Sequence, residues 1–151
     1  MANHVDYREI VSQIQALTEG IPYEIANLSN ITALLWQELP ELNWVGFYKM
    51  TDGALVLYPF QGKPACIRIP VGKGVCGTAA AEHRTVRVEN VHEFPGHIAC
   101  DGASNSEIVL PLYRQDCLWG VLDLDSPVFG RFTPEDQQGL ELVCRTIEAL
   151  L

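Results

Sequence analysis

The chain has 151 residues, 48% of them hydrophobic, which is the length of one domain with a core of its own. Its 19 acidic residues outnumber its 10 lysines and arginines, so the net charge is −9. Binding to nucleic acid or to an anionic membrane requires an extended basic stripe, and this acidic balance disfavours both partners. No apolar run approaches the about 18 residues of a membrane span, and the polar N-terminus is not a signal peptide. We therefore expect residues 1–151 to form a single cytoplasmic domain.

The hydrophobic pattern predicts helices at both ends of the chain with strands between them. A first helix ends at Gly20, a second spans residues 23–39, and a last one begins after Thr133, with Pro134 at its first position and Asp136 at its third. Strands are expected at residues 43–50, 54–60, 66–71, 85–91, 107–114 and 118–125, with a short helix at 76–83 and a loop at 92–106. In the strand at 66–71, alternation places Ile67, Ile69 and Val71 on the buried side. These elements indicate an α+β domain, a mainly antiparallel sheet with the N- and C-terminal helices packed against it.

Residues 72–77 read GKGVCG and match the GxGxxG pattern of dinucleotide-binding loops. The helix that follows is barely two turns long, and hairpins outnumber βαβ units, so a nucleotide cradle is disfavoured. We expect instead that these glycines form a tight turn with Cys76 near a helix N-terminus. The helix dipole there would lower the pKa of the thiol and favour the thiolate.

The chain has an odd number of cysteines and no CxxC pair; they stand at positions 66, 76, 100, 117 and 144. Cys144 falls on the apolar face of the last helix and is expected in the core, whereas Cys117 lies at a turn. Cys66, Cys76 and Cys100 lie at element ends and in loops, where function concentrates.

Zinc is the alternative use of these three thiols, with His97 as a further ligand. Structural zinc sites usually take two ligands from a short knuckle, and only the spacing from His97 to Cys100 fits one. In a reducing compartment, redox chemistry is therefore the preferred interpretation.

Strand alternation places Asp123 and Asp125 on one face of their strand. Glu107 opens the neighbouring strand and lies opposite Asp125 if the connecting loop holds three residues, but not if the turn has two. The acids then form either a solvated face or a pocket that binds an ammonium group and keeps one acid protonated by mutual repulsion. Trp44 and Tyr48 also share a strand face, a spacing more often found in a core than in a ligand site.

Five segments in order carry a family resemblance: QGKPAC at 61–66, GKGVCG at 72–77, FPGHIACD at 94–101, SNSEIV at 104–109 and GVLDLDS at 120–126. Together they closely resemble the free methionine-(R)-sulfoxide reductases, small stand-alone GAF-domain enzymes. One departure is Tyr58, at a position where a glycine is expected. The resemblance implies a GAF fold, commonly as a homodimer, that reduces free methionine (R)-sulfoxide. The alternative is a GAF module that senses a small molecule without turnover.

The resemblance also implies roles for particular residues. Cys100 is implied to attack the substrate, and Cys76 or Cys66 to resolve the resulting sulfenic acid. The implied substrate site consists of the acids Glu107, Asp123 and Asp125 and the aromatic walls Trp44 and Tyr48. Sulfoxide reduction requires a protonated acid near the sulfoxide oxygen and an external dithiol, expected to be thioredoxin, but no metal or organic cofactor.

Overall fold

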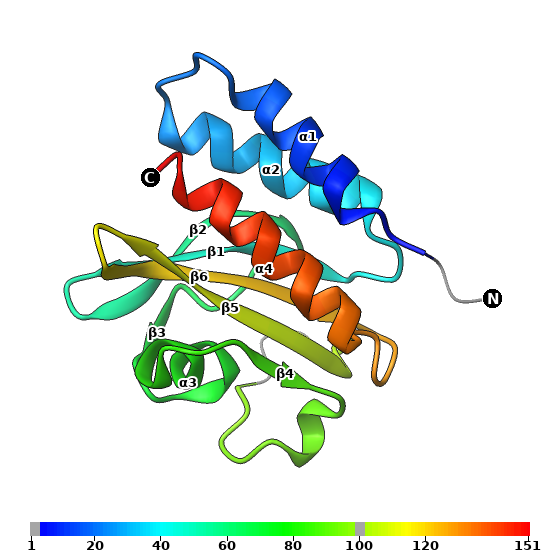
Figure 1. The fold of residues 1–151 in the computed structure, drawn as a ribbon. Helices are drawn as coiled ribbons and strands as arrows, with labels where there is room; N and C mark the ends of the chain where they lie inside the picture. The colour runs from blue at the N-terminus through cyan, green and yellow to red at the C-terminus, as the bar shows by residue number, and fades with distance from the viewer. Residues whose placement is uncertain (1–3, 99–101) are drawn as a thin grey trace.

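The computed structural model describes residues 4–98 and 102–151 and has a six-stranded antiparallel sheet with helices on both faces (Figure 1). The strands are β1 (Trp44–Thr51), β2 (Ala54–Gly62), β3 (Arg68–Pro70), β4 (Val86–Val88), β5 (Ser106–Arg114) and β6 (Cys117–Ser126). Their order in the sheet is β3-β2-β1-β6-β5-β4. The helices are α1 (Tyr7–Thr18), α2 (Glu24–Glu38), α3 (Gly74–Glu82) and α4 (Pro134–Glu148), with a 3-10 turn η1 (Val91–Glu93). The predicted α+β architecture is confirmed.

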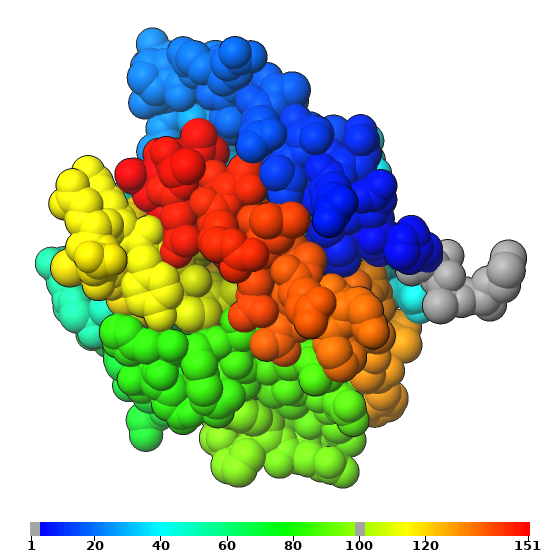
Figure 2. Space-filling view, in the orientation of Figure 1, coloured from blue at the N-terminus to red at the C-terminus, as the bar shows by residue number. Residues whose placement is uncertain are grey.

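Helices α1, α2 and α4 form a layer over one face of the sheet (Figure 1), and in space-filling view α1 and α4 lie directly against each other (Figure 2). Leu28, Ile31 and Leu35 of α2 are fully buried in the core that this layer forms with β1, β5 and β6. The predicted start of α4 is confirmed, because the Thr133 hydroxyl accepts from the Asp136 amide and the Asp136 carboxylate accepts from the Thr133 amide. The C-terminal helix is thereby fixed at its first turn.

The opposite face of the sheet carries α3 and a smaller core of its own. Val109 of β5 and Val121 of β6 are fully buried against this core, while their neighbours in sequence point into the helix layer. Strands β5 and β6 are therefore buried on both faces. This arrangement explains why each strand contains a continuous run without polar side chains, at 108–112 and at 118–122.

The β5–β6 hairpin corrects one expectation. Its turn has two residues, Gln115 and Asp116, both at positive φ, yet Glu107 still pairs with Asp125. A β-bulge restores the register: Tyr113 pairs with Leu118 but Leu112 pairs with Gly120, so one extra residue is accommodated in β6. The rule that a two-residue turn would separate the acids was wrong because it assumed a ladder without a bulge.

The expected strand at 66–71 is shorter than predicted and its alternation was partly wrong. Only residues 68–70 form β3, and of the three apolar residues assigned to one buried side only Ile69 is buried. Ile67 is 73% exposed and Val71 is 41% exposed, because β3 is an edge strand. The strand predicted at 85–91 likewise shortens to β4, with η1 following it. Within the described chain, no helix has the length and apolarity needed to cross a membrane.

Candidate functional site

A pocket lies on the α3 face of the sheet, where β1, β5 and β6 run side by side. Six of the eight residues singled out in the sequence line it: Trp44, Tyr48, Cys76, Glu107, Asp123 and Asp125. The segments at 64–65, 73–75 and 97–98 complete its walls, together with Ile69 and Ser104. The β-bulge described above brings β5 and β6 into the register that places Glu107 opposite Asp125.

The glycine turn before α3 places Cys76 in the first turn of that helix, as predicted. Gly74 has a φ of +64°, and the Gly72 amide donates to the Gly77 carbonyl oxygen over 2.8 Å. A Cβ on Gly77 would lie 2.5 Å from the Pro70 carbonyl oxygen, so this close approach requires glycine. The motif therefore serves to seat a thiol against the sheet.

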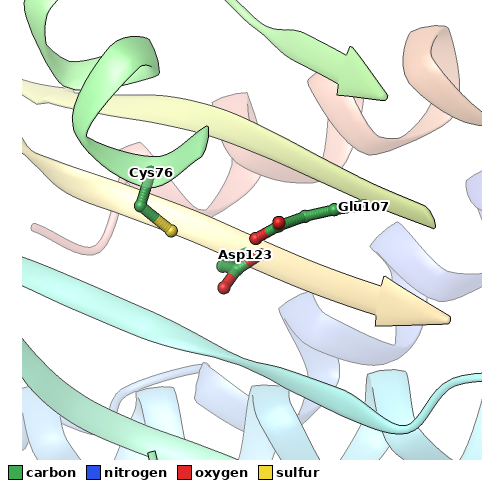
Figure 3. Close-up of side chains that lie close together, drawn as sticks. All are labelled: Cys76, Glu107 and Asp123. Carbon is green, nitrogen blue, oxygen red and sulfur yellow. The ribbon is translucent and has the colours of Figure 1, made fainter. Parts of the chain in front are cut away.

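Three groups from three elements converge at the bottom of the pocket. Figure 3 shows the Cys76 sulfur pointing from α3 toward the carboxyl groups of Asp123 and Glu107. One ligand-type atom from each of the three lies within 4.8 Å of the others, and all three side chains are buried. This spacing also suits a metal ion. Cys66 and His97, two members of the alternative zinc set, are not part of this cluster, and Cys100 lies outside the described residues.

Burial and mutual repulsion control the ionisation of these acids. Desolvation raises the pKa of Glu107 well above its usual value, and the nearby charges of Asp123 and Asp125 raise it further. Desolvation also raises the pKa of Asp123, although hydrogen bonds from Glu107 and Cys76 oppose this rise. Glu107 is therefore the acid that retains a proton, and Asp123 is its hydrogen-bonded neighbour. The alternative of a solvated acidic face does not hold.

The predicted effect of the helix dipole on Cys76 was wrong. Burial raises the pKa of this thiol well above its usual value, and the carboxyl groups of Asp123, Glu107 and Asp125 raise it further. The dipole at the start of a nine-residue helix cannot offset complete desolvation beside three acids. Cys76 is thus a neutral thiol whose sulfur faces Asp123 and Glu107.

Trp44 and Tyr48 form an aromatic wall beside the acids. Both residues belong to the smaller core and also line the pocket. The Trp44 and Tyr48 rings stack with centroids 5.8 Å apart, and Phe60 extends the stack 5.2 Å from Trp44. The wall is anchored to the segment at 63–66, because the Trp44 indole donates to the Lys63 carbonyl and the Tyr48 hydroxyl donates to the Cys66 carbonyl. Phe60 was not identified from the sequence, because the sequence of β2 does not indicate which of its residues stacks on Trp44.

The remaining cysteines separate as the sequence suggested. Cys144 is buried in the core of the helix layer and Cys117 is exposed at the β5–β6 turn. Cys66 is partly exposed and is disulfide-bonded, whereas Cys76, Cys117 and Cys144 are free thiols. Cys100, the predicted attacking residue, lies outside the described residues.

His97 and Ser104 are among the pocket residues that were missed as site residues in the sequence. His97 was considered only as a zinc ligand, yet its Nε2 lies 3.9 Å from Glu107 Oε1. Burial and the neighbouring His92 lower the pKa of His97, which keeps the ring neutral. Ser104 accepts a hydrogen bond of 2.9 Å from the Asn43 amide. His97 lies in the FPGHIACD segment and Ser104 in the SNSEIV segment, so the family resemblance of these segments could have identified them.

The sequence and the fold match known proteins over almost their full length. The GAF domain family matches residues 15–151. The free methionine-R-sulfoxide reductase of Escherichia coli (strain K12) is 54% identical over 145 residues, which cover 96% of this chain and 88% of the relative. The solved structure of fRMsr of Staphylococcus aureus in complex with its substrate superimposes with a TM-score of 0.94, at 48% identity, and covers 100% of this chain and 99% of its own. The chain belongs to the free methionine-R-sulfoxide reductase family.

A second complex supports the assignment. The free methionine-R-sulfoxide reductase from Neisseria meningitidis in complex with its substrate has a TM-score of 0.92 and 40% identity over 99% of this chain and 94% of its own. Tyr58, the departure from the pattern of free methionine-R-sulfoxide reductases, packs on the helix side of the sheet. Its hydroxyl donates to Glu24 over 2.9 Å and its ring meets Trp119 edge to face. The substitution therefore lies on the opposite side of the sheet from the pocket.

Proposed function

We propose that this chain reduces free methionine (R)-sulfoxide to methionine. The observation that carries the proposal is Asp123, a buried pocket acid whose Oδ1 accepts no hydrogen bond among the described residues. An acceptor in that position favours a ligand with a strong donor, and the free ammonium of an amino acid is one. A methionine within a peptide has no such charge, which is a physical reason for selectivity toward the free amino acid.

Glu107 is proposed as the acid that protonates the sulfoxide oxygen. A sulfoxide sulfur becomes electrophilic when its oxygen is protonated, and Glu107 is the group whose raised pKa keeps a proton available. Asp125, half-buried at the pocket edge, remains to help hold the ammonium. The rings of Trp44 and Tyr48 provide faces and edges suited to the S-methyl group.

The thiol steps are proposed to follow in two stages. The Cys100 thiolate attacks the substrate sulfur, oxygen passes from that sulfur to the cysteine, and methionine leaves, so methionine gains two electrons and Cys100 becomes a sulfenic acid. A second thiol then attacks the sulfenic sulfur, forms a disulfide and releases water. Cys66 suits this second role better than Cys76, because Cys66 is disulfide-bonded and Cys76 is a free, neutral thiol. The disulfide that this second step forms is thus proposed to join Cys100 and Cys66.

An external dithiol must return the two cysteines to thiols, and we propose thioredoxin for this step. The chain requires no metal or organic cofactor for any step of this sequence. We also propose that the protein acts in the cytoplasm as a homodimer, in keeping with the resemblance from which these expectations came.

The test is consumption of the separate R and S forms of free methionine sulfoxide, with thioredoxin recycling the protein. We expect turnover of the R form alone, abolished in Cys100→Ser. In Cys66→Ser we expect one methionine released per protein before turnover stops. Cys117→Ser, which removes an exposed thiol outside the pocket, is the matched control and should turn over like the wild type. Binding of the sulfoxide without turnover by the wild type would instead support a sensor module.

A further inference from the structure

One stretch of this acidic protein contains no acidic residue. Residues 53–81 include Lys63, Arg68 and Lys73 but no aspartate or glutamate, so all 19 acids lie elsewhere, with the other seven lysines and arginines. The three cations are exposed. This stretch therefore contributes only positive charge to the surface of a molecule whose net charge is −9.

Exposed apolar side chains lie between these cations. Ile67 is 73% exposed and Val71 is 41% exposed, although residues of this type are usually buried. We call the set Lys63, Ile67, Arg68, Val71 and Lys73 the basic rim. It combines exposed apolar side chains with positive charges along one short stretch of the chain, a composition that suits contact with another protein.

The partly exposed, disulfide-bonded Cys66 lies within this stretch, directly before Ile67 and Arg68. Two hydrogen bonds hold the backbone at Cys66 and at the next residue: the Tyr48 hydroxyl donates to the Cys66 carbonyl over 2.9 Å, and the Leu57 amide donates to the Ile67 carbonyl over 2.9 Å. The sulfur is therefore presented from a fixed segment at the sheet edge. Thiol–disulfide exchange needs direct access of the attacking thiolate to a disulfide sulfur, so the surface around that sulfur selects the reductant.

We propose that the basic rim is the docking surface for a protein dithiol whose contact face is apolar around its thiols and acidic at the edge. The inference rests on the proposed function, since it concerns the step that returns Cys66 to a thiol. A thiolate of the partner attacks Cys66 Sγ, and the original disulfide breaks, releasing the other cysteine as a thiolate that takes up a proton. The partner's second thiol then displaces Cys66, so that the partner is oxidised by two electrons and this chain is reduced by two.

The test is the second-order rate constant with which reduced thioredoxin, an acidic dithiol protein, reduces the pre-oxidised chain, followed in stopped flow without any sulfoxide. We expect Arg68→Glu and Ile67→Ser each to lower this rate constant about tenfold, through lost steering and lost apolar contact. The wild-type rate should fall as salt rises, and the Arg68→Glu rate should fall less. Reduction by dithiothreitol, which needs no docking surface, should be unchanged in both variants.

The matched controls are Arg8→Glu on α1 and Ile25→Ser on α2, which make the same changes at exposed positions on the helix layer. They should react with thioredoxin like the wild type. If Arg68→Glu and Arg8→Glu had equal rate constants, or if salt had no effect, the basic rim would not be the docking surface. Because the assay contains no sulfoxide, absence of sulfoxide turnover would refute the proposed function and leave this rate constant unaffected.

Discussion

Glu107 shows how a single buried residue can act as an acid at neutral pH. Its side chain has left water and faces Asp123 and Asp125, so ionising it would add a third negative charge to one pocket. Retaining the proton is the less costly state, and this is also the state that the proposed chemistry requires. Burial beside Asp123 and Asp125 thus lowers the stability of the fold, and the same burial keeps Glu107 protonated for the proposed reaction.

The raised pKa of Glu107 determines how stability depends on pH. Above its unfolded pKa the unfolded chain releases this proton while the native chain keeps it, so the native state binds more protons and the free energy of unfolding falls as pH rises. We expect Glu107→Gln to flatten this fall, so that the variant gains stability relative to the wild type at high pH but not at low pH. Urea unfolding at several pH values measures this difference. Parallel curves for the two proteins would show that Glu107 has an ordinary pKa.

The same proton should set the pH profile of turnover. We expect kcat/KM of the wild type to fall on the alkaline side as Glu107 ionises, and Glu107→Gln to lose about 100-fold or more at neutral pH, since the amide cannot donate a full proton. Methionine formation at saturating dithiothreitol checks this expectation. His92→Gln, in which the changed residue lies on η1 outside the pocket lining, is the control. An unchanged kcat/KM in Glu107→Gln would assign the acid elsewhere.

Cysteine reactivity should follow burial rather than position in a helix. The pKa values of Cys76 and Cys144 are raised by burial, whereas Cys117 is exposed. We expect iodoacetamide to modify Cys117 rapidly in the folded protein and to reach Cys76 and Cys144 only after unfolding, because the reagent needs an accessible thiolate. Mass spectrometry of the alkylated peptides distinguishes the three sites. Rapid modification of Cys76 in the folded protein would instead support the prediction that the helix dipole keeps this residue as a thiolate.

The sequence allowed the composition of the site to be predicted better than its ionisation. Alternation correctly placed Asp123 and Asp125 on one face, because that periodicity is local. The burial of Asp123 and the closure of the pocket by Cys76 depend on α3 packing across the sheet, a contact between distant segments. The predicted direction of the pKa shift of Cys76 was wrong for this reason. The helix dipole is local and can be inferred from the sequence, whereas the desolvation of the thiol depends on the tertiary packing.

At the scale of elements, the β5–β6 hairpin decides whether the acids meet. Its two-residue turn alone would shift the strands by one position and separate Glu107 from Asp125; the bulge in β6 removes this shift. The bulge could not be predicted because nothing in the sequence of β6 distinguishes the extra residue from its neighbours. Helix boundaries were easier, since caps such as Thr133 and Gly20 are local signals.

The hairpin turn also offers a local test of backbone strain. Gln115 and Asp116 have φ values of 51° and 63°, the left-handed region that glycine occupies at little cost. We expect Asp116→Gly to raise the free energy of unfolding by about 1 kcal/mol, measured by urea denaturation. Gln138→Gly, on the exposed side of α4, is the control and should lower it by about 1 kcal/mol. Destabilisation by Asp116→Gly would show that the aspartate side chain contributes more than the strain costs.

At the scale of the whole molecule, the sheet separates two cores with different tasks. The helix layer buries one face and contains none of the pocket residues, while the smaller core on the α3 face includes Trp44, Tyr48 and Cys76. Val109 belongs to this second core and pairs with Asp123 across the β5–β6 ladder. Changes in packing should therefore affect catalysis on one side of the sheet and stability alone on the other.

A pair of truncations tests this separation. Leu35→Ala, on α2 in the helix layer, should lower the free energy of unfolding by about 2–5 kcal/mol and leave kcat/KM unchanged well below the unfolding temperature. Val109→Ala should cost about 2 kcal/mol, and it should also raise KM for methionine sulfoxide, because a cavity beside Asp123 loosens the acid that faces the ligand. Thermal unfolding and steady-state kinetics on the same preparations provide both quantities. Equal changes of KM in the two variants would mean that the sheet transmits packing defects between its faces and that the pocket depends on the whole fold.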